Sequence, residues 1–407
     1  MSDFYQNGIV TTLHNLTNRT VDDLEAELLR HAKVRPMSLV LPSLYSELEG
    51  PALSSIVDHL ARVPYLNEIV IGLDRASEEE YRHALAFFSR LPQHHRILWN
   101  DGPRLMALHR EIAARGLAPV ELGKGRNVWY CLGYVLASGR SSSVALHDCD
   151  IITYDRELLA RLIYPVANPN FSYEFCKGYY ARFAGGRLNG RVTRLLVTPL
   201  IRALKKVVGT NDYLDFMDSF RYPLSGEFSM RVDVISDIRI PSDWGLEIGS
   251  LSEMHRNYAT NHLCQVDIAD SYDHKHQDVS FDNVDGGLSK MSIDIAKALF
   301  RKLATHGVVF NQETFRTIKA AYFRIALDLV ETYRNDAIIN GLILDVHEEE
   351  EQVELFARNI ISAGAHFLEY PMEAPFIPNW NRVVSAMPDV LERFEAAVEA
   401  DYQEFGQ

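Results

Sequence analysis

Apolar runs of strand length alternate with helix-like segments through the first 150 residues, and this alternation restricts the fold more than any other feature. Helix-like segments separate four such runs: "MSLVLPSL" (37–44), "EIVIGL" (68–73), "RILW" (96–99) and "SSVALH" (142–147). Pro51 and Ser77 stand where two of the helices would begin. Strands that alternate with helices form parallel sheets with both faces covered. We therefore expect an α/β chain with a mainly parallel sheet, in which Pro42 stops the first strand.

The second half of the chain has a different pattern. "FSYEFCKGYYARF" (171–183) alternates like a strand, and "RVTRLLVTPLIRALKKV" (191–207) has helical periodicity after a Gly-rich stretch. From about residue 288 to the end the spacing is helical almost throughout. The acidic run 348–351 fits a solvated first helical turn. We expect this region to pack on the preceding part of the chain or to mediate association.

Composition and charge narrow the class of protein. The net charge of −14 over 407 residues disfavours nucleic acid as a partner, and an anionic ligand would need a local basic pocket. No apolar run reaches the roughly 18 residues of a membrane span, and the N-terminus lacks the features of a secretory signal. The cysteines form no CxxC pair, which suits reduced thiols: Cys131, Cys149, Cys176 and Cys264. These features predict a soluble, cytoplasmic protein without a membrane partner.

Asp148 and Asp150 form a D-x-D sequence directly after a strand-like run. Ligands of open parallel sheets bind outside the carboxyl ends of the strands. In a turn there, both carboxylates can face one hard cation, such as Mg²⁺ or Mn²⁺, that also holds a diphosphate. A chance D-x-D is the plain alternative, and a Cys149 nucleophile with a His147 base lacks a nucleophile-elbow signature. In a regular strand His147 and Cys149 would share the opposite face, where we expect them to pack.

Two glycine-containing segments are candidates for anion binding. In "GKGRNVW", Lys124 stands between two glycines before a predicted helix, where exposed amides and a lysine can hold phosphate, although the segment is not a Walker loop. In "LNGRVTRLL", Gly190 permits close backbone approach, and Arg191 and Thr193 offer donors. For each segment an ordinary helix start with a solvated cation is the alternative.

Two glutamates and two histidines complete the candidates. Glu227 in "YPLSGEFSM" and Glu247 in "SDWGLEIGSL" stand among glycines, and a glutamate in a cleft can orient a hydroxyl. In "SYDHKHQD", His274 or His276 could complete the coordination of a cation. Solvated loop residues are the alternative for all four, since a lone histidine is usually no ligand.

In chain order these segments resemble the glucosyl-3-phosphoglycerate synthases, retaining glycosyltransferases of the GT-A type. The matching pieces lie between about residues 37 and 280: "LVLPSL", "GKG", "DCDII", "CKGYYAR", "GRVTRLLVTPLIRAL", "PLSGEF", "WGLEIGSL" and "DHKH". The resemblance implies a Rossmann-like, nucleotide-sugar-binding GT-A domain with a helical C-terminal extension. We divide the chain into an N-terminal segment (1–36), the GT-A domain (37–287) and the helical region (288–407). The domain would have a nucleotide-sugar half at about 37–165 and an acceptor half at about 166–287.

The resemblance also implies roles for single residues. The donor would be bound by six of them: Pro42, Ser43, Leu44, Asp74, Lys124 and Asp148. Three would hold the phosphate of 3-phosphoglycerate: Gly190, Arg191 and Thr193. Asp150 and His274 would bind the metal, with His276 as the backup. Glu247 would face the donor sugar or the acceptor hydroxyl, and Glu227 would lie close to the sugar.

The base pocket departs from the pattern of the family in two places. "LPSLYSE" stands where the family has "LPALNEE", so that Tyr45 and Ser46 replace an Asn-Glu pair and Glu47 is a candidate for the uracil contact. In "GLDRASEE", Asp74 is the candidate that would serve in place of an Asp-Ser-Gly-Ser-rich turn. The nucleotide of the donor therefore stays open between UDP, GDP and ADP.

The reaction that the resemblance implies is transfer of glucose from a nucleotide-glucose to the 2-hydroxyl of 3-phosphoglycerate. Retention of the anomeric configuration, Mg²⁺ or Mn²⁺ as the cofactor and a place in the glucosylglycerate pathway of compatible solutes are expected with it. The helical C-terminal region leads us to expect a homodimer. The alternatives are mannosyl transfer to the same acceptor, transfer to plain glycerate, a silent sugar-nucleotide-binding scaffold, and a metal-dependent phosphohydrolase. The segment "GRVT" favours a phosphorylated acceptor.

Overall fold

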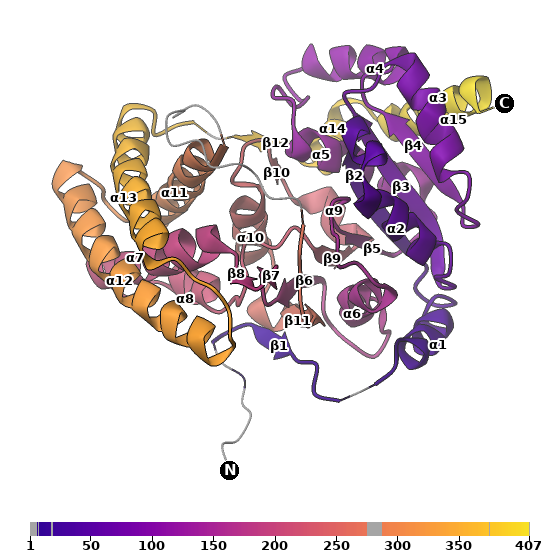
Figure 1. Cartoon of the computed structure of the whole chain (residues 1–407). Coiled ribbons are helices and arrows are strands. Elements are labelled where there is room, and N and C mark those ends of the chain that lie inside the picture. The colour runs from indigo at the N-terminus through magenta and orange to yellow at the C-terminus, as the bar shows by residue number, and fades with distance from the viewer. Residues whose placement is uncertain (1–5, 7, 18, 275–286, 374, 407) are drawn as a thin grey trace.

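A central eight-stranded sheet organises the computed structural model, which describes residues 6, 8–17, 19–274, 287–373 and 375–406 (Figure 1). In spatial order the strands are β1 (Thr11–Leu13), β11 (Leu263–Ala269), β6 (Phe175–Tyr180), β9 (Phe228–Arg231), β5 (Ser143–Leu146), β2 (Met37–Leu44), β3 (Leu66–Asp74) and β4 (His95–Trp99). Neighbouring strands are parallel except where β9 runs antiparallel to β5 and β6. The expected α/β class with a mainly parallel sheet is confirmed.

Helices cover both faces of the sheet, and each face has its own hydrophobic core. The first core includes side chains from α1 (Val21–His31), α2 (Pro51–Leu60), α3 (Glu78–Phe88) and α6 (Arg156–Ala167). The second includes side chains from α4 (Pro103–Ala113), α5 (Lys124–Ser138), α7 (Thr198–Val208), α8 (Asp212–Asp218), α9 (Val232–Asp237) and α10 (Leu246–Asn257). Leu39 and Leu41 of β2 belong to the first core and Val40 to the second, as the alternation of side chains along a strand requires.

Local sequence signals explain several element boundaries. Ser77 caps α3 in a capping box with Glu80, and Pro51 stands in the first turn of α2, as expected. β2 continues through Pro42 to Leu44, so the prediction that this proline stops the strand is wrong. β5 pairs with β2 only as far as Val40, whereas β3 pairs with it to the end. Beyond Val40 one side of β2 is therefore unpaired, and a residue without an N–H is tolerated there.

The C-terminal region contributes α11 (Gly287–Thr305), α12 (Gln312–Ile339), α13 (Val346–Glu369), α14 (Trp380–Ala386) and α15 (Val390–Phe405). α12 packs on α7, and α13 packs on α11 and α12. α15 instead crosses to α4, α5 and β4, on the opposite side of the molecule (Figure 1). There Arg96 of β4 donates to both carboxylate oxygens of Glu399, at 2.6 and 2.9 Å. The helices after residue 287 thus pack on two separate parts of the preceding chain, while the proposed domain boundaries stay predictions.

Two short two-stranded sheets complete the fold: β7 (Phe183–Ala184) with β8 (Arg187–Leu188), and β10 (Ile240–Pro241) with β12 (Phe376–Ile377). The N-terminal segment supplies β1 at the edge of the main sheet, parallel to β11. None of the helices in the described part of the chain is both long and apolar enough to span a membrane.

Candidate active site

A cavity of about 1030 Å³ is lined by the ends of β2 and β3, the loop after β5, and the first turns of α5 and α10. This is the carboxyl edge of the parallel strands, where ligands of such sheets bind. Ten of the predicted site residues line it: Pro42, Ser43, Leu44, Asp74, Lys124, Asp148, Asp150, Gly190, Arg191 and Glu247. His274 lines it as well, whereas His276 lies outside the described residues. Thr193 and Glu227 are buried and lie outside this lining.

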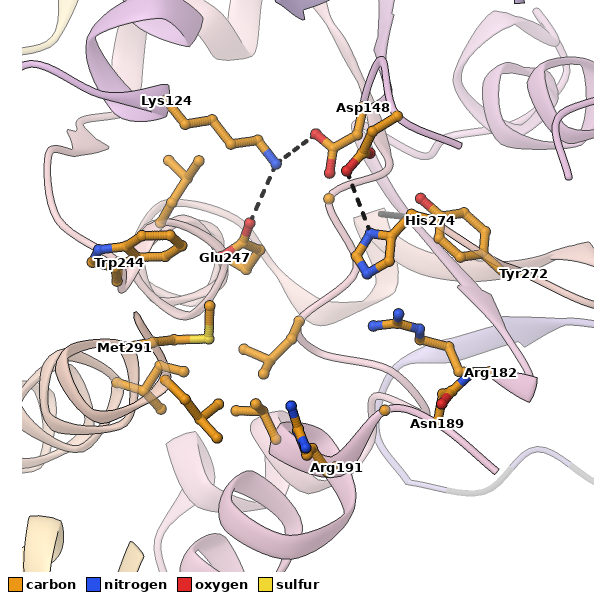
Figure 2. A pocket seen from close by; sticks show the side chains of 18 of the residues that line it. Lys124, Asp148, Arg182, Asn189, Arg191, Trp244, Glu247, Tyr272, His274 and Met291 are labelled. Carbon is orange, nitrogen blue, oxygen red and sulfur yellow. Dashed lines mark ion pairs between the residues drawn. The ribbon is translucent and has the colours of Figure 1, made fainter. Parts of the chain in front are cut away.

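Lys124, at the first position of α5, links two of the carboxylates in the cavity (Figure 2). Its Nζ lies 2.6 Å from Asp148 Oδ1 and 3.7 Å from Glu247 Oε1. Burial lowers the pKa of Lys124, but Asp148 and Glu247 more than offset this and raise it above its ordinary value. Burial likewise raises the pKa of Asp148, and Lys124 more than reverses the effect. The cluster therefore holds an ammonium and a carboxylate at neutral pH.

A glycine makes this close approach possible. A Cβ on Gly226 would lie 2.6 Å from Asp148 Oδ2 and 3.0 Å from Lys124 Nζ, so a larger residue would displace the pair. Gly226 belongs to the segment "PLSGEF", whose glycine thus serves the site through packing.

Asp150 meets His274 because two distant segments pair. Ile151 forms an antiparallel bridge with His274, and Ile152 N donates to Asp273 O at 2.9 Å. As a result His274 Nδ1 lies 3.9 Å from Asp150 Oδ2. Burial, and then the charge of Asp148, raise the pKa of Asp150 to about 7. Its Oδ1 is buried and has no hydrogen-bond partner among the described residues.

The donor set around Asp150 fits a divalent cation that is shared with a ligand. Among the residues that the structure describes, no group of three or more His, Cys, Asp or Glu side chains is arranged to hold a metal. The carboxylate of Asp150, with its unpartnered buried oxygen, and the imidazole of His274 are two suitable ligands. Mg²⁺ commonly takes few protein ligands and completes its shell with phosphates and water.

His147 and Cys149 are packed into the protein. β5 ends at Leu146, so regular strand alternation does not extend to them, yet both side chains are buried. His147 Nδ1 lies 2.9 Å from Asp148 O, and burial raises the pKa of the Cys149 thiol well above its ordinary value. A neutral, buried thiol is a poor nucleophile, so the packing role fits best.

At the end of the cavity where the resemblance would place the nucleotide base lie Glu47 and a buried ion-pair cluster. Tyr45 belongs to a 3₁₀ turn (Tyr45–Glu49), and its OH lies 3.0 Å from His83 Nδ1 of α3, whereas Glu47 lines the cavity. Asp74 accepts from Asn100 Nδ2 at 2.7 Å and from Arg126 Nη2 at 3.1 Å. Burial raises the pKa of Asp74 despite this arginine.

The side of the cavity that the resemblance would assign to the acceptor, here called the acceptor side, is built by the π-helical turn η2 (Val192–Val197) and by α13. Gly190 has a φ of 74°, in the left-handed region that favours glycine. Arg191 Nη1 lies 3.6 Å from Glu348 Oε1, in the first turn of α13. Thr193 Oγ1 is buried without a hydrogen-bond partner in the described part of the chain.

Glu227 lies beneath the cavity, where its buried carboxylate accepts three hydroxyl hydrogen bonds. The donors are Ser225 Oγ at 2.7 Å, Tyr180 OH at 2.9 Å and Tyr272 OH at 2.6 Å. The rings of Tyr180 and Tyr272 are stacked 3.7 Å apart, and Tyr272 precedes His274 by two residues. Glu227 therefore helps to hold Tyr272, which lines the cavity, and its place close to the sugar stays a prediction.

Several cavity residues were missed by the sequence analysis. Figure 2 shows Arg182, Tyr272, Trp244 and Met291 among the lining side chains. Others come from the C-terminal helices and the loop before α13: Leu288, Ile295, Ile343, Leu344, Asp345 and Glu348. Arg182 and Trp244 lie inside or beside segments already singled out, "CKGYYAR" and "WGLEIGSL". The C-terminal residues carry no motif, and only their position in the fold identifies them.

The chain is similar to several known proteins along most of its length. No family model matches the chain. It is 46% identical over 401 residues to the glucosyl-3-phosphoglycerate synthase of Persephonella marina, an alignment that covers 98% of this chain and 99% of the relative. It is 38% identical over 410 residues to the glucosyl-3-phosphoglycerate synthase of Methanococcoides burtonii, with 99% of both chains covered.

Solved structures support the fold. The Mycobacterium tuberculosis glucosyl-3-phosphoglycerate synthase, in complex with Mn²⁺, UDP-glucose and phosphoglyceric acid, is similar with a TM-score of 0.52. The two chains are 21% identical over 72% of this chain and 88% of that one. A structure of the same mycobacterial protein with Mg²⁺ and UDP has a TM-score of 0.50 at 22% identity, over 73% of this chain and 87% of that one. The expected GT-A type of fold is confirmed by this likeness.

Proposed function

The chain belongs to the glucosyl-3-phosphoglycerate synthase family, and from this premise we propose that it transfers glucose from UDP-glucose to the 2-hydroxyl of 3-phosphoglycerate with retention of configuration. The observation that carries the proposal is one continuous cavity lined both by the residues proposed for the donor and by those proposed for the acceptor. Lys124, Asp148 and Glu247 cluster at one end, and Arg191 reaches the other. The mycobacterial relative, crystallised with UDP-glucose and phosphoglyceric acid, supports this choice of substrates.

Mg²⁺ or Mn²⁺ is the proposed cofactor, since structures of the mycobacterial relative contain one or the other with UDP. Asp150 and His274 would hold it, because they are the carboxylate and imidazole that meet at the cavity. When bound, such a cation neutralises the charge that builds up on the departing diphosphate, which is worth several kcal/mol.

The side chains of this chain supply orientation and fixed charge. Lys124, which stays protonated, lies where it can bind the diphosphate, and Glu247 can orient the sugar or the acceptor hydroxyl. Arg191 and the amides that follow Gly190 would anchor the phosphate of the acceptor, which converts a bimolecular encounter into a positioned one. Asp148 and Glu247 both lie beside Lys124, which suits a positioning role for these carboxylates rather than covalent attack on the sugar. Front-face attack, with the departing phosphate helping to take the proton, is therefore the proposed route.

A donor and acceptor screen tests this function. Release of nucleotide would be measured for UDP-, GDP- and ADP-glucose and GDP-mannose, each with 3-phosphoglycerate or glycerate, with Mg²⁺, Mn²⁺ or EDTA. We expect turnover that depends on UDP-glucose, 3-phosphoglycerate and metal, and an α-anomeric product by NMR. Faster turnover with GDP-mannose, or with glycerate, would favour the alternative synthases, and nucleotide release without an acceptor would favour a phosphohydrolase.

Two variants connect the activity to the site. Asp150→Asn should abolish most turnover at unchanged thermal stability, whereas Asp58→Asn, exposed on α2, should leave turnover unchanged. Arg191→Ala should raise the acceptor KM far more than the donor KM. Wild-type turnover in metal-supplemented Asp150→Asn would refute the metal assignment.

The cellular setting of this reaction is part of the proposal. The product would enter the glucosylglycerate pathway of compatible solutes, in the cytoplasm. The homodimer stays a prediction, which light scattering of the full-length chain in solution would check.

A further inference from the structure

Arg182 is a cation in the cavity to which no role has been given so far. It follows β6 and lines the acceptor side, and in Figure 2 its guanidinium points into the cavity between His274 and Arg191. Asn189 N donates to Arg182 O at 2.8 Å, which closes the β7–β8 hairpin. A Cβ on Gly190 would lie 3.4 Å from Arg182 Cβ. The hairpin therefore brings Arg182 next to the Gly190–Arg191 segment.

The guanidinium of Arg182 uses few of its five N–H donors on the protein. Nη1 donates to Tyr222 OH at 3.2 Å. Nε is buried and has no hydrogen-bond partner among the residues that the structure describes. No described carboxylate forms an ion pair with it, whereas Arg191 and Arg194 have Glu348 and Glu349. A half-buried, unpaired cation is costly unless a ligand supplies the missing acceptors.

Tyr222 fixes the direction of this side chain. Its ring lies 5.0 Å from that of Tyr180, which is itself held by Glu227. The hydroxyl of Tyr222, whose ring packs on Tyr180, thus holds the guanidinium in an orientation toward the cavity. Such preorganisation is typical of a binding residue, because less rotamer freedom is lost when the ligand arrives.

Arg182 and Arg191 together make this side of the cavity strongly cationic. Burial lowers the pKa of Arg191, and the positive charge of Arg182 is among the groups that lower it further. Two guanidinium groups on one wall repel each other until anions lie between or against them. The arrangement fits a small molecule with two separate anionic groups.

On the basis of the proposed function, we propose that Arg182 binds the carboxylate of the acceptor while Arg191 binds its phosphate. In 3-phosphoglycerate these two groups flank the carbon that bears the reactive hydroxyl. Holding both ends would direct that hydroxyl toward the donor sugar, and the planar guanidinium suits a carboxylate with two parallel hydrogen bonds. Arg182 would then make the enzyme select 3-phosphoglycerate over phosphorylated alcohols that lack the carboxylate.

Glycerol 3-phosphate is the probe that tests this assignment, because it has the phosphate but not the carboxylate. Calorimetry would measure binding of both compounds to the full-length protein with UDP and Mg²⁺. For Arg182→Met we expect the affinity for 3-phosphoglycerate to fall about ten- to a hundredfold, as for the loss of a charge-assisted hydrogen-bond pair. Affinity for glycerol 3-phosphate should change less than about threefold, since its phosphate contacts remain.

Matched variants separate this role from a structural one. Tyr222→Phe keeps the cation but removes the hydroxyl that orients it. It should lower the ratio of the affinity for 3-phosphoglycerate to the affinity for glycerol 3-phosphate, by a smaller factor than Arg182→Met does. Arg324→Met, which removes an exposed arginine of α12, should change neither affinity. Arg182→Lys should recover part of the affinity for 3-phosphoglycerate. If Arg182→Met does not fold, Tyr222→Phe and Arg182→Lys still allow the affinities for 3-phosphoglycerate and glycerol 3-phosphate to be compared.

The outcomes are distinguishable from failure of the proposed function. If the wild-type protein neither binds 3-phosphoglycerate nor glucosylates it, the proposed function is wrong. If the wild type is active but Arg182→Met weakens the binding of 3-phosphoglycerate and of glycerol 3-phosphate equally, Arg182 binds the phosphate or supports the fold. The assignment of Arg182 to the carboxylate is then wrong. Unchanged binding of 3-phosphoglycerate to Arg182→Met would also refute the assignment.

Discussion

Arg194 and Glu349 form a bidentate, buried ion pair between η2 and the first turn of α13, with Nη–Oε distances of 2.6 and 2.8 Å. Arg194 Nε also donates to Asn189 O at 2.8 Å, and the guanidinium lies over the ring of Tyr333 in α12. The pair therefore attaches the C-terminal helices to the segment that carries Gly190 and Arg191. α12 and α13 therefore pack together with the segment that carries Gly190 and Arg191.

Breaking this pair should destabilise the protein. Arg194→Met or Glu349→Gln leaves its partner charge buried and uncompensated, which typically costs about 3–5 kcal/mol. The double variant Arg194→Met/Glu349→Leu should recover most of the loss, because no buried charge remains. Urea unfolding measures all three, with the exposed Arg324→Met as the control. Additive losses in the double variant would contradict the coupling.

Glu348 should weaken binding of the acceptor. It lies 3.6 Å from Arg191 Nη1 and lines the cavity, so an anionic ligand must displace it. Glu348→Gln should lower the acceptor KM about three- to fivefold, since exposed ion pairs are worth up to about 1 kcal/mol. Glu351→Gln removes the same charge from α13, where Glu351 faces His347, and should have little effect. A higher acceptor KM in Glu348→Gln would mean that Glu348 orients Arg191.

Glu227 should affect the apparent affinity for the divalent cation. A glutamine cannot accept from Ser225, Tyr180 and Tyr272 as the carboxylate does, so the support of Tyr272, two residues before His274, is weakened. Loss of such outer partners typically costs about 10–100-fold in metal affinity. Activity would be titrated with Mg²⁺ in Glu227→Gln and in Tyr272→Phe. Tyr258→Phe, which loses a hydroxyl at the exposed Asp237, is the control. An unchanged Mg²⁺ dependence with a raised donor KM would instead indicate direct contact with the sugar.

Glu68 should make stability depend on pH. It is fully buried in β3, and burial raises its pKa from 4.5 to about 7 even though Ser138 Oγ donates to it at 2.8 Å. Between these values the folded state binds more protons than the unfolded state, so this group reduces stability as the pH rises. The difference between the two pKa values corresponds to about 3 kcal/mol.

Glu68→Gln isolates this contribution. Burial lowers the pKa of the nearby His94 from 6.5 to about 4, so the histidine raises stability over nearly the same pH range and masks the effect in the wild type. The difference in unfolding free energy between Glu68→Gln and the wild type should be small at pH 4.5 and should grow in favour of the variant up to pH 8. A constant difference across this range would contradict the assignment.

The sequence by itself determined those features that depend on a few neighbouring residues. Strand-length apolar runs, the Ser77 cap and the glycines around Lys124 predicted elements that the structure contains, because side-chain periodicity and capping are local. The D-x-D after β5 could be placed at the ligand-binding edge of a parallel sheet for the same reason. Where a local rule depended on the neighbouring strand, as at Pro42, the prediction was wrong.

The tertiary structure decided which of these local features meet. Asp150 faces His274 only because Ile151 pairs with a segment far along the chain. Glu227 is buried where two tyrosine hydroxyls from distant segments, with the neighbouring Ser225, donate to its carboxylate. Helical periodicity in residues 288–407 predicted helices but not the surface that they cover. That choice depends on packing and on buried pairs such as Arg194–Glu349, which join residues that no local pattern relates.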